Sequence, residues 1–210
     1  NIFKKNVLIE NYFKYNEFLN NYDKSENFYL DGYWQDIKYF KNNEKELSSQ
    51  FTIKKKFLSN DYKKLESKIL NNQNSICVHV RKDDYLNKNN KKIYENISPK
   101  YYYNSISYFK KYFQKPEVYI FSDDKKWVYD NFDINKEIII SNYKLKTIEE
   151  FSLTTQFRNI IISNSTFSLW ASLLNNSLNK KIIVPKNWFK NQNEQKTSKL
   201  LTKQMVTLKN

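Results

Sequence analysis

The second half of the chain alternates between short apolar runs and longer amphipathic stretches. The apolar runs cover residues 76–80, 118–121, 138–140, 160–162 and 182–184. Runs of this length are typical of buried strands, and the stretches between them are long enough for helices. Apolar strands separated by helices predict a parallel sheet that is covered on both faces. We therefore expect residues 72–190 to form one doubly wound α/β domain.

Local signals place helices between these strands. Ser98 and Pro99 open a helix that runs to about Phe113, because serine caps helices and proline suits their first turn. Further helices are expected from Asp123 or Asp124 to Tyr129, from Thr147 onward, and from Ser165 to Asn175. Residues 1–71 are less regular, apart from an amphipathic helix over 61–70. Residues 191–210 are interpreted as a polar C-terminal tail.

The chain is strongly basic, with 36 Lys and Arg against 22 Asp and Glu and a net charge of +14. Such a charge suggests a polyanionic partner. The lysines, however, are scattered among asparagines along the whole chain, which is typical of solvated surfaces. We therefore expect no nucleic-acid partner and keep peripheral contact with an anionic membrane as a secondary expectation.

Rare residue types are more informative than the abundant ones. Arginine occurs only at positions 81 and 158, glycine only at 32, histidine only at 79 and cysteine only at 77. A chain that uses lysine for most cations keeps arginine where a planar fork is needed. Cys77, within an apolar run, is interpreted as a buried core residue. The lone cysteine and the lack of a membrane-length apolar run favour a cytoplasmic protein.

Polar residues follow three of the predicted strands, where doubly wound sheets bind their ligands. The segments are His79 to Tyr85, Ser122 to Asp124, and Ser163 to Ser168. An arginine can bind a phosphate with two parallel hydrogen bonds, and a helix N-terminus is an anion site. Together these segments predict a phosphate or diphosphate pocket. Taken singly, Asp123 is equally a helix cap and His79 a core histidine.

Several other chemistries lack their residue patterns. The chain has no glycine-rich phosphate loop, no Cys/His metal spacing and no G-x-S-x-G elbow. Its carboxylate pairs, Asp83-Asp84 and Asp123-Asp124, are adjacent and lack D-x-D spacing. We therefore expect no metal and no cofactor.

Five segments, taken in order, resemble motifs of the α-1,2-fucosyltransferase family (glycosyltransferase family 11). His79 to Tyr85 resembles H-x-R-R-G-D-Y, and Tyr119 to Asp124 is similar to a segment that contains F-S-D-D. Glu150 to Trp170 resembles the D-x-x-L…N-S-S-F-S-W-W block, and Pro185 to Phe189 is similar to the usual strand exit. Upstream, Gly32 to Phe40 is similar to G-Y-F-Q…K-Y-F. The resemblance spans residues 32–189.

The sequence departs from the family pattern at three positions and in one segment. Lys82 stands in place of a second arginine, Asp83 in place of glycine, and Leu169 in place of the first tryptophan of the W-W pair. The family's G-G-L-G-N-Q segment is absent. This absence leads us to expect an N-terminally truncated chain, with residues 1–71 a partial acceptor-side region.

The resemblance implies a GT-B architecture, in which two Rossmann-like domains face each other across the donor site. It implies an inverting, metal-independent transfer of L-fucose from GDP-fucose to a galactoside 2-hydroxyl, with a terminal galactose on the glycan acceptor. Such a bacterial enzyme would build a surface glycan such as lipopolysaccharide O-antigen at the cytoplasmic face of the inner membrane.

The resemblance also implies roles for single residues. Arg81 is the expected catalytic residue, because it would stabilise the charge that develops on the β-phosphate, with Lys82 assisting. His79 and Glu150 are expected to recognise guanine. The same diphosphate is expected to bind at a helix N-terminus formed by Ser165, Thr166, Phe167 and Ser168.

Two roles stay open at this point. Asp123 either orients the Arg81 loop or contacts the donor. Asp84 is a candidate general base or a loop-fixing residue, and we assign no base. The competing hypotheses for the whole chain are a transferase of another nucleotide sugar, a GDP-binding protein without catalysis, and a basic nucleic-acid binder.

Overall fold

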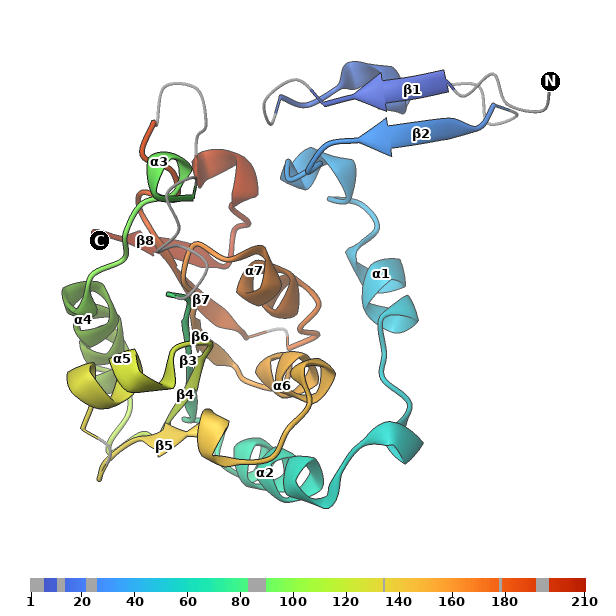
Figure 1. The fold of residues 1–210 in the computed structure, drawn as a ribbon. Coiled ribbons are helices and arrows are strands. Elements are labelled where there is room, and N and C mark those ends of the chain that lie inside the picture. The colour runs from blue at the N-terminus through green and yellow to red at the C-terminus, as the bar shows by residue number, and fades with distance from the viewer. Residues whose placement is uncertain are drawn as a thin grey trace.

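A six-stranded parallel sheet forms the centre of the molecule (Figure 1). The computed structural model describes residues 6–10, 14–21, 26–82, 90–133, 135–177, 179–191 and 197–210. The strands are β3 (Ile76–Val80), β4 (Val118–Ser122), β5 (Ile138–Ile139), β6 (Asn159–Ile161), β7 (Lys181–Pro185) and β8 (Met205–Leu208). Their order in the sheet is β5-β4-β3-β6-β7-β8. The chain therefore starts in the middle, moves outward on one side, and returns to build the other side, as in a Rossmann sheet.

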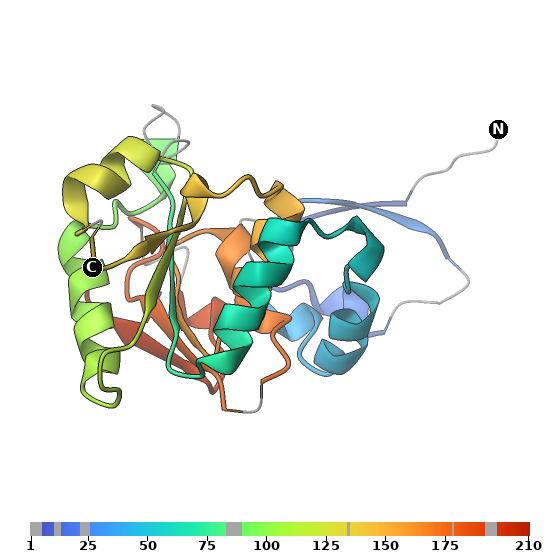
Figure 2. The same ribbon diagram turned by 90° about the horizontal axis from the view of Figure 1, so that it is seen from below.

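Helices cover both faces of this sheet (Figures 1 and 2). On one face lie α4 (Pro99–Lys110) and α5 (Lys125–Asn131), and on the other α2 (Asn60–Asn71), α6 (Thr147–Thr154) and α7 (Thr166–Leu173). Alternate strand residues supply the two cores, because successive side chains of a strand point to opposite faces. In β3, Ile76 and Val78 pack with α4 and α5, whereas Cys77 packs with α2, α6 and α7. The expected doubly wound arrangement around a parallel sheet is thus confirmed, the expected domain bounds of 72–190 stay a prediction, and Cys77 is a fully buried core residue.

Side-chain caps begin two of the helices, whereas the expected cap Ser98 makes no capping hydrogen bond at the start of α4. Ser59 accepts a hydrogen bond from Tyr62 N at 3.2 Å and caps α2. Asp124, not Asp123, caps α5, because its Oδ1 accepts from Trp127 N at 2.8 Å. This cap leaves the neighbouring carboxylate of Asp123 available for another partner.

The sheet extends beyond the five expected strands. In β8, Met205 to Leu208 pair in parallel with Ile182 to Pro185 of β7. Part of the segment interpreted as a polar tail therefore belongs to the sheet. The run was not recognisable because β8 is a half-exposed edge strand and carries only four residues between polar neighbours. The expected third strand is also shorter, since Ile140 already belongs to a 3-10 turn.

The N-terminal part of the chain contributes a small two-stranded ribbon that is separate from the main sheet. The chain that follows this ribbon runs beside α7. β1 (Asn6–Ile9) and β2 (Phe28–Asp31) pair in parallel. Figure 1 shows this ribbon beyond the sheet edge at which β3 ends, and the chain from α1 to α2 passing beside α7 and α6. The remaining elements are η1 (Glu17–Asn20), η2 (Ile37–Tyr39), α1 (Glu44–Gln50), η3 (Lys55–Phe57), α3 (Asn90–Ile93) and η6 (Thr197–Leu200).

Two contacts join this N-terminal part to α7. The rings of Phe40 and Trp170 lie 4.7 Å apart between centroids. Ser48, on α1, donates a hydrogen bond of 2.9 Å to the carbonyl of Leu174, directly after α7. Whether residues 1–71 are the remnant of a second GT-B domain stays a prediction. Within the described ranges, no helix combines the length and the apolar composition that crossing a bilayer requires.

Candidate functional site

The polar segments expected at the strand ends meet at one edge of the sheet. β3 lies between β4 and β6, with Val80 beside Ser122 and Val78 beside Ile161. Because the strands are parallel, the residues that follow them emerge at the same edge. Arg81, Asp123 and the segment from Ser163 to Ser168 therefore surround the point where the strand order reverses. A ligand-binding crevice opens at this point in doubly wound sheets.

The carboxylate of Asp123 holds the chain that leaves β3. Its Oδ2 lies 3.1 Å from Nε of Arg81, and its Oδ1 accepts a hydrogen bond of 2.9 Å from Lys82 N. The side chain of Asp123 is 17% exposed and that of Arg81 is 32% exposed. One carboxylate therefore binds both a guanidinium and the neighbouring backbone, and it sets the direction in which Arg81 points.

Lys82 points toward α4 and α5. It is buried, and its ammonium donates to Asn96 Oδ1 at 3.0 Å and to the carbonyl of Ile97. The same ammonium lies 4.5 Å from the ring centroid of Trp127. Burial lowers the pKa of Lys82 to about 8, and the nearby Asp123 and Asp124 partly oppose this shift. In this position Lys82 fixes the loop around Arg81, and its predicted contact with a diphosphate stays a prediction.

His79 lies in an aromatic environment on the face of β3 that carries α7. Its ring centroid is 5.3 Å from that of Phe167, which in turn is 5.1 Å from Phe151. His79 is 6% exposed, and its Nδ1 has no hydrogen-bond partner in the part of the chain that the structure describes. Burial, assisted by the charge of Arg81, lowers the pKa of His79 to about 3. The imidazole is therefore neutral at physiological pH, and its Nδ1 is a buried polar atom whose hydrogen bond is not made within the described residues.

Glu150 lies on α6, next to Phe151. Its side chain is half-buried, and burial raises the pKa of its carboxyl group. The helix α6 packs on α7, so Glu150 and His79 come from elements on the same face of the sheet.

The helix α7 has small polar residues at its N-terminus and a cation at its C-terminal end. Ser165 occupies the N-cap position and makes no capping hydrogen bond with its side chain, while Ser168 donates to the carbonyl of Ser165 at 3.1 Å. Thr166 is exposed and Phe167 is half-buried. At the C-terminus, Lys180 donates to the carbonyls of Ser172, Leu173 and Asn175 at 3.0, 3.2 and 2.6 Å. A cation at the C-terminal end complements the helix dipole, whose positive end faces the crevice.

Asn164 fixes the turn that leads into α7. It is fully buried, and its Nδ2 donates to the carbonyls of Glu95 and Trp188 at 2.8 and 2.9 Å. The sequence analysis assigned Asn164 no role in the site. It also assigned none to Asn96 and Trp127, which are the partners of Lys82. The position of Asn164 within the N-S-T-F-S segment was a usable signal for it, whereas the role of Asn96 depends on a contact between distant loops.

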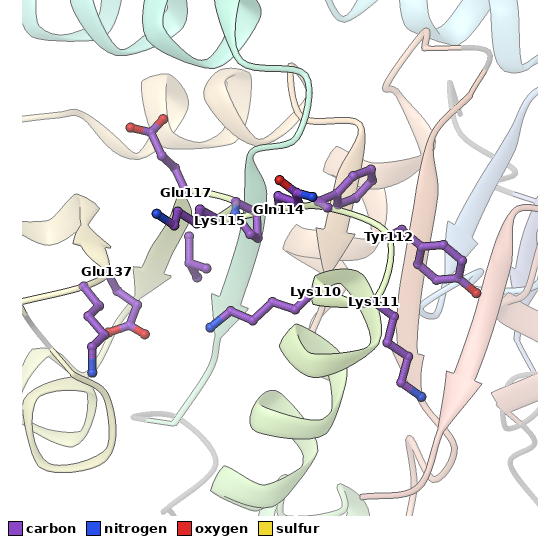
Figure 3. A pocket seen from close by; sticks show the side chains of 11 residues that line it. Lys110, Lys111, Tyr112, Gln114, Lys115, Glu117 and Glu137 are labelled. Carbon is purple, nitrogen blue, oxygen red and sulfur yellow. The ribbon is translucent and has the colours of Figure 1, made fainter.

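Two parts of the prediction have a different outcome. Asp83, Asp84 and Tyr85 lie outside the described residues, so the roles considered for Asp84 stay predictions. A depression of about 950 Å³ lies at the opposite edge of the sheet and contains none of the expected site residues (Figure 3). Charges of both signs line it, among them Lys110, Lys115, Glu117 and Glu137. Because its lining carries charges of both signs and lies away from the carboxyl ends of the strands, this depression does not fit the predicted diphosphate pocket.

The fold is that of a Rossmann-like α/β protein, and the polar residues of the candidate site gather at the ends of its strands. The family model of glycosyl transferase family 11 matches residues 1–207, and the chain belongs to this family, as the motif resemblance predicted. No solved structure matches the chain.

Two curated relatives from Escherichia coli are similar to this chain. The first, O-antigen biosynthesis glycosyltransferase WbnK, is 29% identical over 203 residues, which cover 93% of this chain and 66% of the relative. The second, alpha-1,2-colitosyltransferase, is 32% identical over 170 residues, which cover 77% of this chain and 56% of the relative. The chain thus matches only part of each relative's length.

The burial of neutral His79 predicts a specific dependence of stability on pH. The pKa is about 3 in the folded protein and 6.5 in its ordinary state, so the unfolded chain binds the extra proton first as the pH falls. The free energy of unfolding is therefore unaffected by this group above pH 6.5 and falls as the pH is lowered toward 3. We expect this group to contribute about 2 kcal/mol less at pH 5 than at pH 8.

Urea unfolding of the wild type and of His79→Gln at both pH values measures this difference. Acidic groups titrate equally in both proteins, so they cancel in the comparison. Stability curves that run parallel between pH 8 and pH 5 would show that His79 is not a buried neutral group.

Proposed function

We propose that this chain carries the donor site of an α-1,2-fucosyltransferase that moves L-fucose from GDP-fucose to the 2-hydroxyl of a terminal galactose. The observation that carries the proposal is the position of Arg81. Asp123 holds it at the same sheet edge as the N-terminus of α7. A guanidinium and a helix N-terminus around one crevice suit a diphosphate, because both offer several N–H donors to an anion.

The reaction needs charge stabilisation more than a reactive side chain. The acceptor oxygen bonds to the anomeric carbon of fucose on the face opposite the leaving group, while the bond from that carbon to the β-phosphate oxygen breaks. The configuration is therefore inverted, and GDP leaves with an added negative charge. Arg81 and the first turn of α7 would stabilise this charge as it develops. The acceptor hydroxyl gives its proton to a base that we do not assign.

The base of the nucleotide would bind near His79. Guanine presents N–H donors that suit a carboxylate and acceptors elsewhere on the ring. Glu150 supplies a carboxylate, and the neutral imidazole of His79 supplies a nitrogen that lacks a partner among the described residues. Phe167 adds an aromatic face beside His79. These three side chains match the size and the mixed polarity of a purine.

The names of the relatives support this proposal in outline. One name describes O-antigen biosynthesis and the other an α-1,2 transfer. We infer from them that this chain belongs to a bacterial enzyme of O-antigen assembly. A position at the inner face of the membrane, where the +14 charge would meet anionic lipid, is part of the same proposal.

Nucleotide titration tests the donor site directly. We expect calorimetry to detect binding of GDP and not of UDP, and Arg81→Ala to weaken GDP binding by roughly 1.5–3 kcal/mol, or about 10- to 150-fold in Kd. The matched control is Arg158→Ala, which changes the other arginine of the chain at the opposite sheet edge, where it contacts Gln73. The donor assignment fails if neither nucleotide binds, or if both arginine variants behave alike.

A double-mutant cycle tests how Asp123 acts. Asp123→Asn keeps the shape of the side chain but removes the charge partner of Arg81. We expect it to weaken GDP binding by about 1 kcal/mol, and to add little when combined with Arg81→Ala, because both changes disturb the same guanidinium. Additive losses in the double variant would mean that Asp123 contacts the donor itself.

The second candidate function is transfer of a different sugar, and the colitosyl name of one relative favours it. A donor with another sugar on the same nucleotide would also bind through GDP, so the transfer product has to separate the two candidates. We expect incubation with GDP-fucose and a β-galactoside to give a product with one added fucose by mass spectrometry, and Arg81→Ala to abolish it. GDP binding without fucose transfer would favour the second candidate.

A further inference from the structure

A second pocket, of about 530 Å³, lies in the N-terminal part of the molecule. Three half-buried aromatic side chains, Tyr15, Trp34 and Tyr39, form its walls. The exposed polar side chains Lys38, Lys41 and Asn42 lie around it. Half-buried rings with amide and ammonium groups beside them are the anatomy of a binding pocket for a ligand that is apolar on one face and polar at its edge.

The three rings are fixed against one another. Tyr39 lies between the other two, with centroid distances of 4.8 Å to Tyr15 and 5.4 Å to Trp34. The hydroxyl of Tyr39 accepts a hydrogen bond of 2.7 Å from Asn16 N, and the ammonium of Lys38 lies 5.1 Å from the ring centroid of Tyr15. The pocket is therefore largely formed before any ligand arrives, which lowers the entropy lost on binding.

Trp34 occupies this wall in a strained backbone conformation. Trp34 has a φ of 51°, a conformation that a bulky side chain rarely adopts. The only glycine, Gly32, comes just before it with a φ of 147°, and a Cβ there would lie 2.3 Å from Cβ of Glu10. The carboxylate of Glu10 also accepts a hydrogen bond of 2.7 Å from Tyr33 N. Strain that the surroundings hold in place is typical of binding sites.

The indole nitrogen of Trp34 adds an independent observation. It is buried and has no hydrogen-bond partner within the described part of the chain. A buried indole N–H normally has a partner, and this one lies beside the turn at Gly32, 3.3 Å from the position of a Cβ there, so it is a further cost that the turn holds in place.

The pocket is close to the candidate donor site. η2 separates it from the main core: Ile37 and Phe40 pack against that core, while Lys38 and Tyr39 line the pocket. Phe40 contacts Trp170, which lies one helical turn, or about 6 Å along the axis, from Thr166 at the N-terminus of α7. Only η2 and one turn of α7 therefore separate the aromatic pocket from the expected position of the diphosphate.

We propose that this pocket binds a pyranose ring of the acceptor glycan. The C–H groups on one face of a pyranose pack against aromatic rings, and its hydroxyl groups exchange hydrogen bonds with amide and ammonium groups. The pocket offers both kinds of partner and no carboxylate among its lining side chains, which fits a neutral sugar better than a cationic ligand. That the sugar is the acceptor rests on the proposed function; that the pocket binds a sugar does not.

Saturation-transfer NMR with methyl β-D-galactopyranoside and, separately, methyl β-D-glucopyranoside tests the proposal. We expect saturation to pass from the protein to at least one glycoside. Trp34→Gly should reduce binding about tenfold, the scale of one lost aromatic contact, because glycine tolerates the positive φ while the ring is removed. Tyr39→Phe should retain binding, since it keeps the ring.

The matched control is Tyr29→Ala, which removes another exposed aromatic ring of the same ribbon outside the pocket. Circular dichroism and GDP titration show whether each variant is folded. If Trp34→Gly is not folded, Tyr15→Leu takes its place. A wild type that binds GDP but neither glycoside overturns the pocket and leaves the donor site intact, as does equal glycoside binding by wild type and a folded Trp34→Gly. Glycoside binding without GDP binding overturns the donor site alone.

Discussion

The carboxylate of Asp123 is the contact on which the candidate site depends. It joins the end of β4 to the end of β3 through the backbone of Lys82 and the guanidinium of Arg81. Both strands are buried and in register up to Val80 and Ser122, so the position of the carboxylate is set by the core and not by the loops. Arg81 is thereby held at the ends of the strands. If it stabilises a leaving group as proposed, preorganisation of this kind would make its electrostatic contact effective in the transition state.

Lys82 shows why a departure from a family motif has to be interpreted through its contacts. The motif has a second arginine at this position, and a lysine loses the planar fork. In the structure the ammonium instead binds an amide oxygen and a backbone carbonyl, and lies against the ring of Trp127. These partners lie in different directions, which suits a compact ammonium better than a flat guanidinium. The lysine therefore fits a role in fixing the loop, and the fork is kept at Arg81.

The sequence predicted the central fold well because its signals are local and strong. Continuous apolar runs identified β3, β4, β6 and β7, and capping residues identified the helices between them. It missed β8, since Met205 to Leu208 have no buried run and acquire their strand geometry only by pairing with β7. The candidate site followed the same division. Placement at the strand ends could be predicted from the order of elements, whereas the direction of Lys82 and the partners of Asn164 depend on contacts between residues far apart in the chain.

The aromatic pocket could not be predicted for a different reason. Tyr15, Trp34 and Tyr39 have no regular spacing, and their meeting depends on the turn at Gly32 and on Asp36. The carboxylate of Asp36 caps η2 by accepting a hydrogen bond of 3.0 Å from Lys38 N. The single glycine of the chain is thus explained by one close approach to Glu10. A residue type that the chain otherwise avoids thus marks a position at which a side chain would collide with its surroundings.

The helix α7 is the element that joins the two proposed sites. Its N-terminus lies at the ends of the strands, Trp170 in its middle packs against Phe40, and Lys180 and Ser48 bind carbonyls at its C-terminal end. An anion at the N-terminus would complement the helix dipole, and Phe40 lies directly beside η2, which lines the aromatic pocket. If both proposed ligands bind, α7 is therefore the physical connection between them, and any coupling of their affinities is reciprocal.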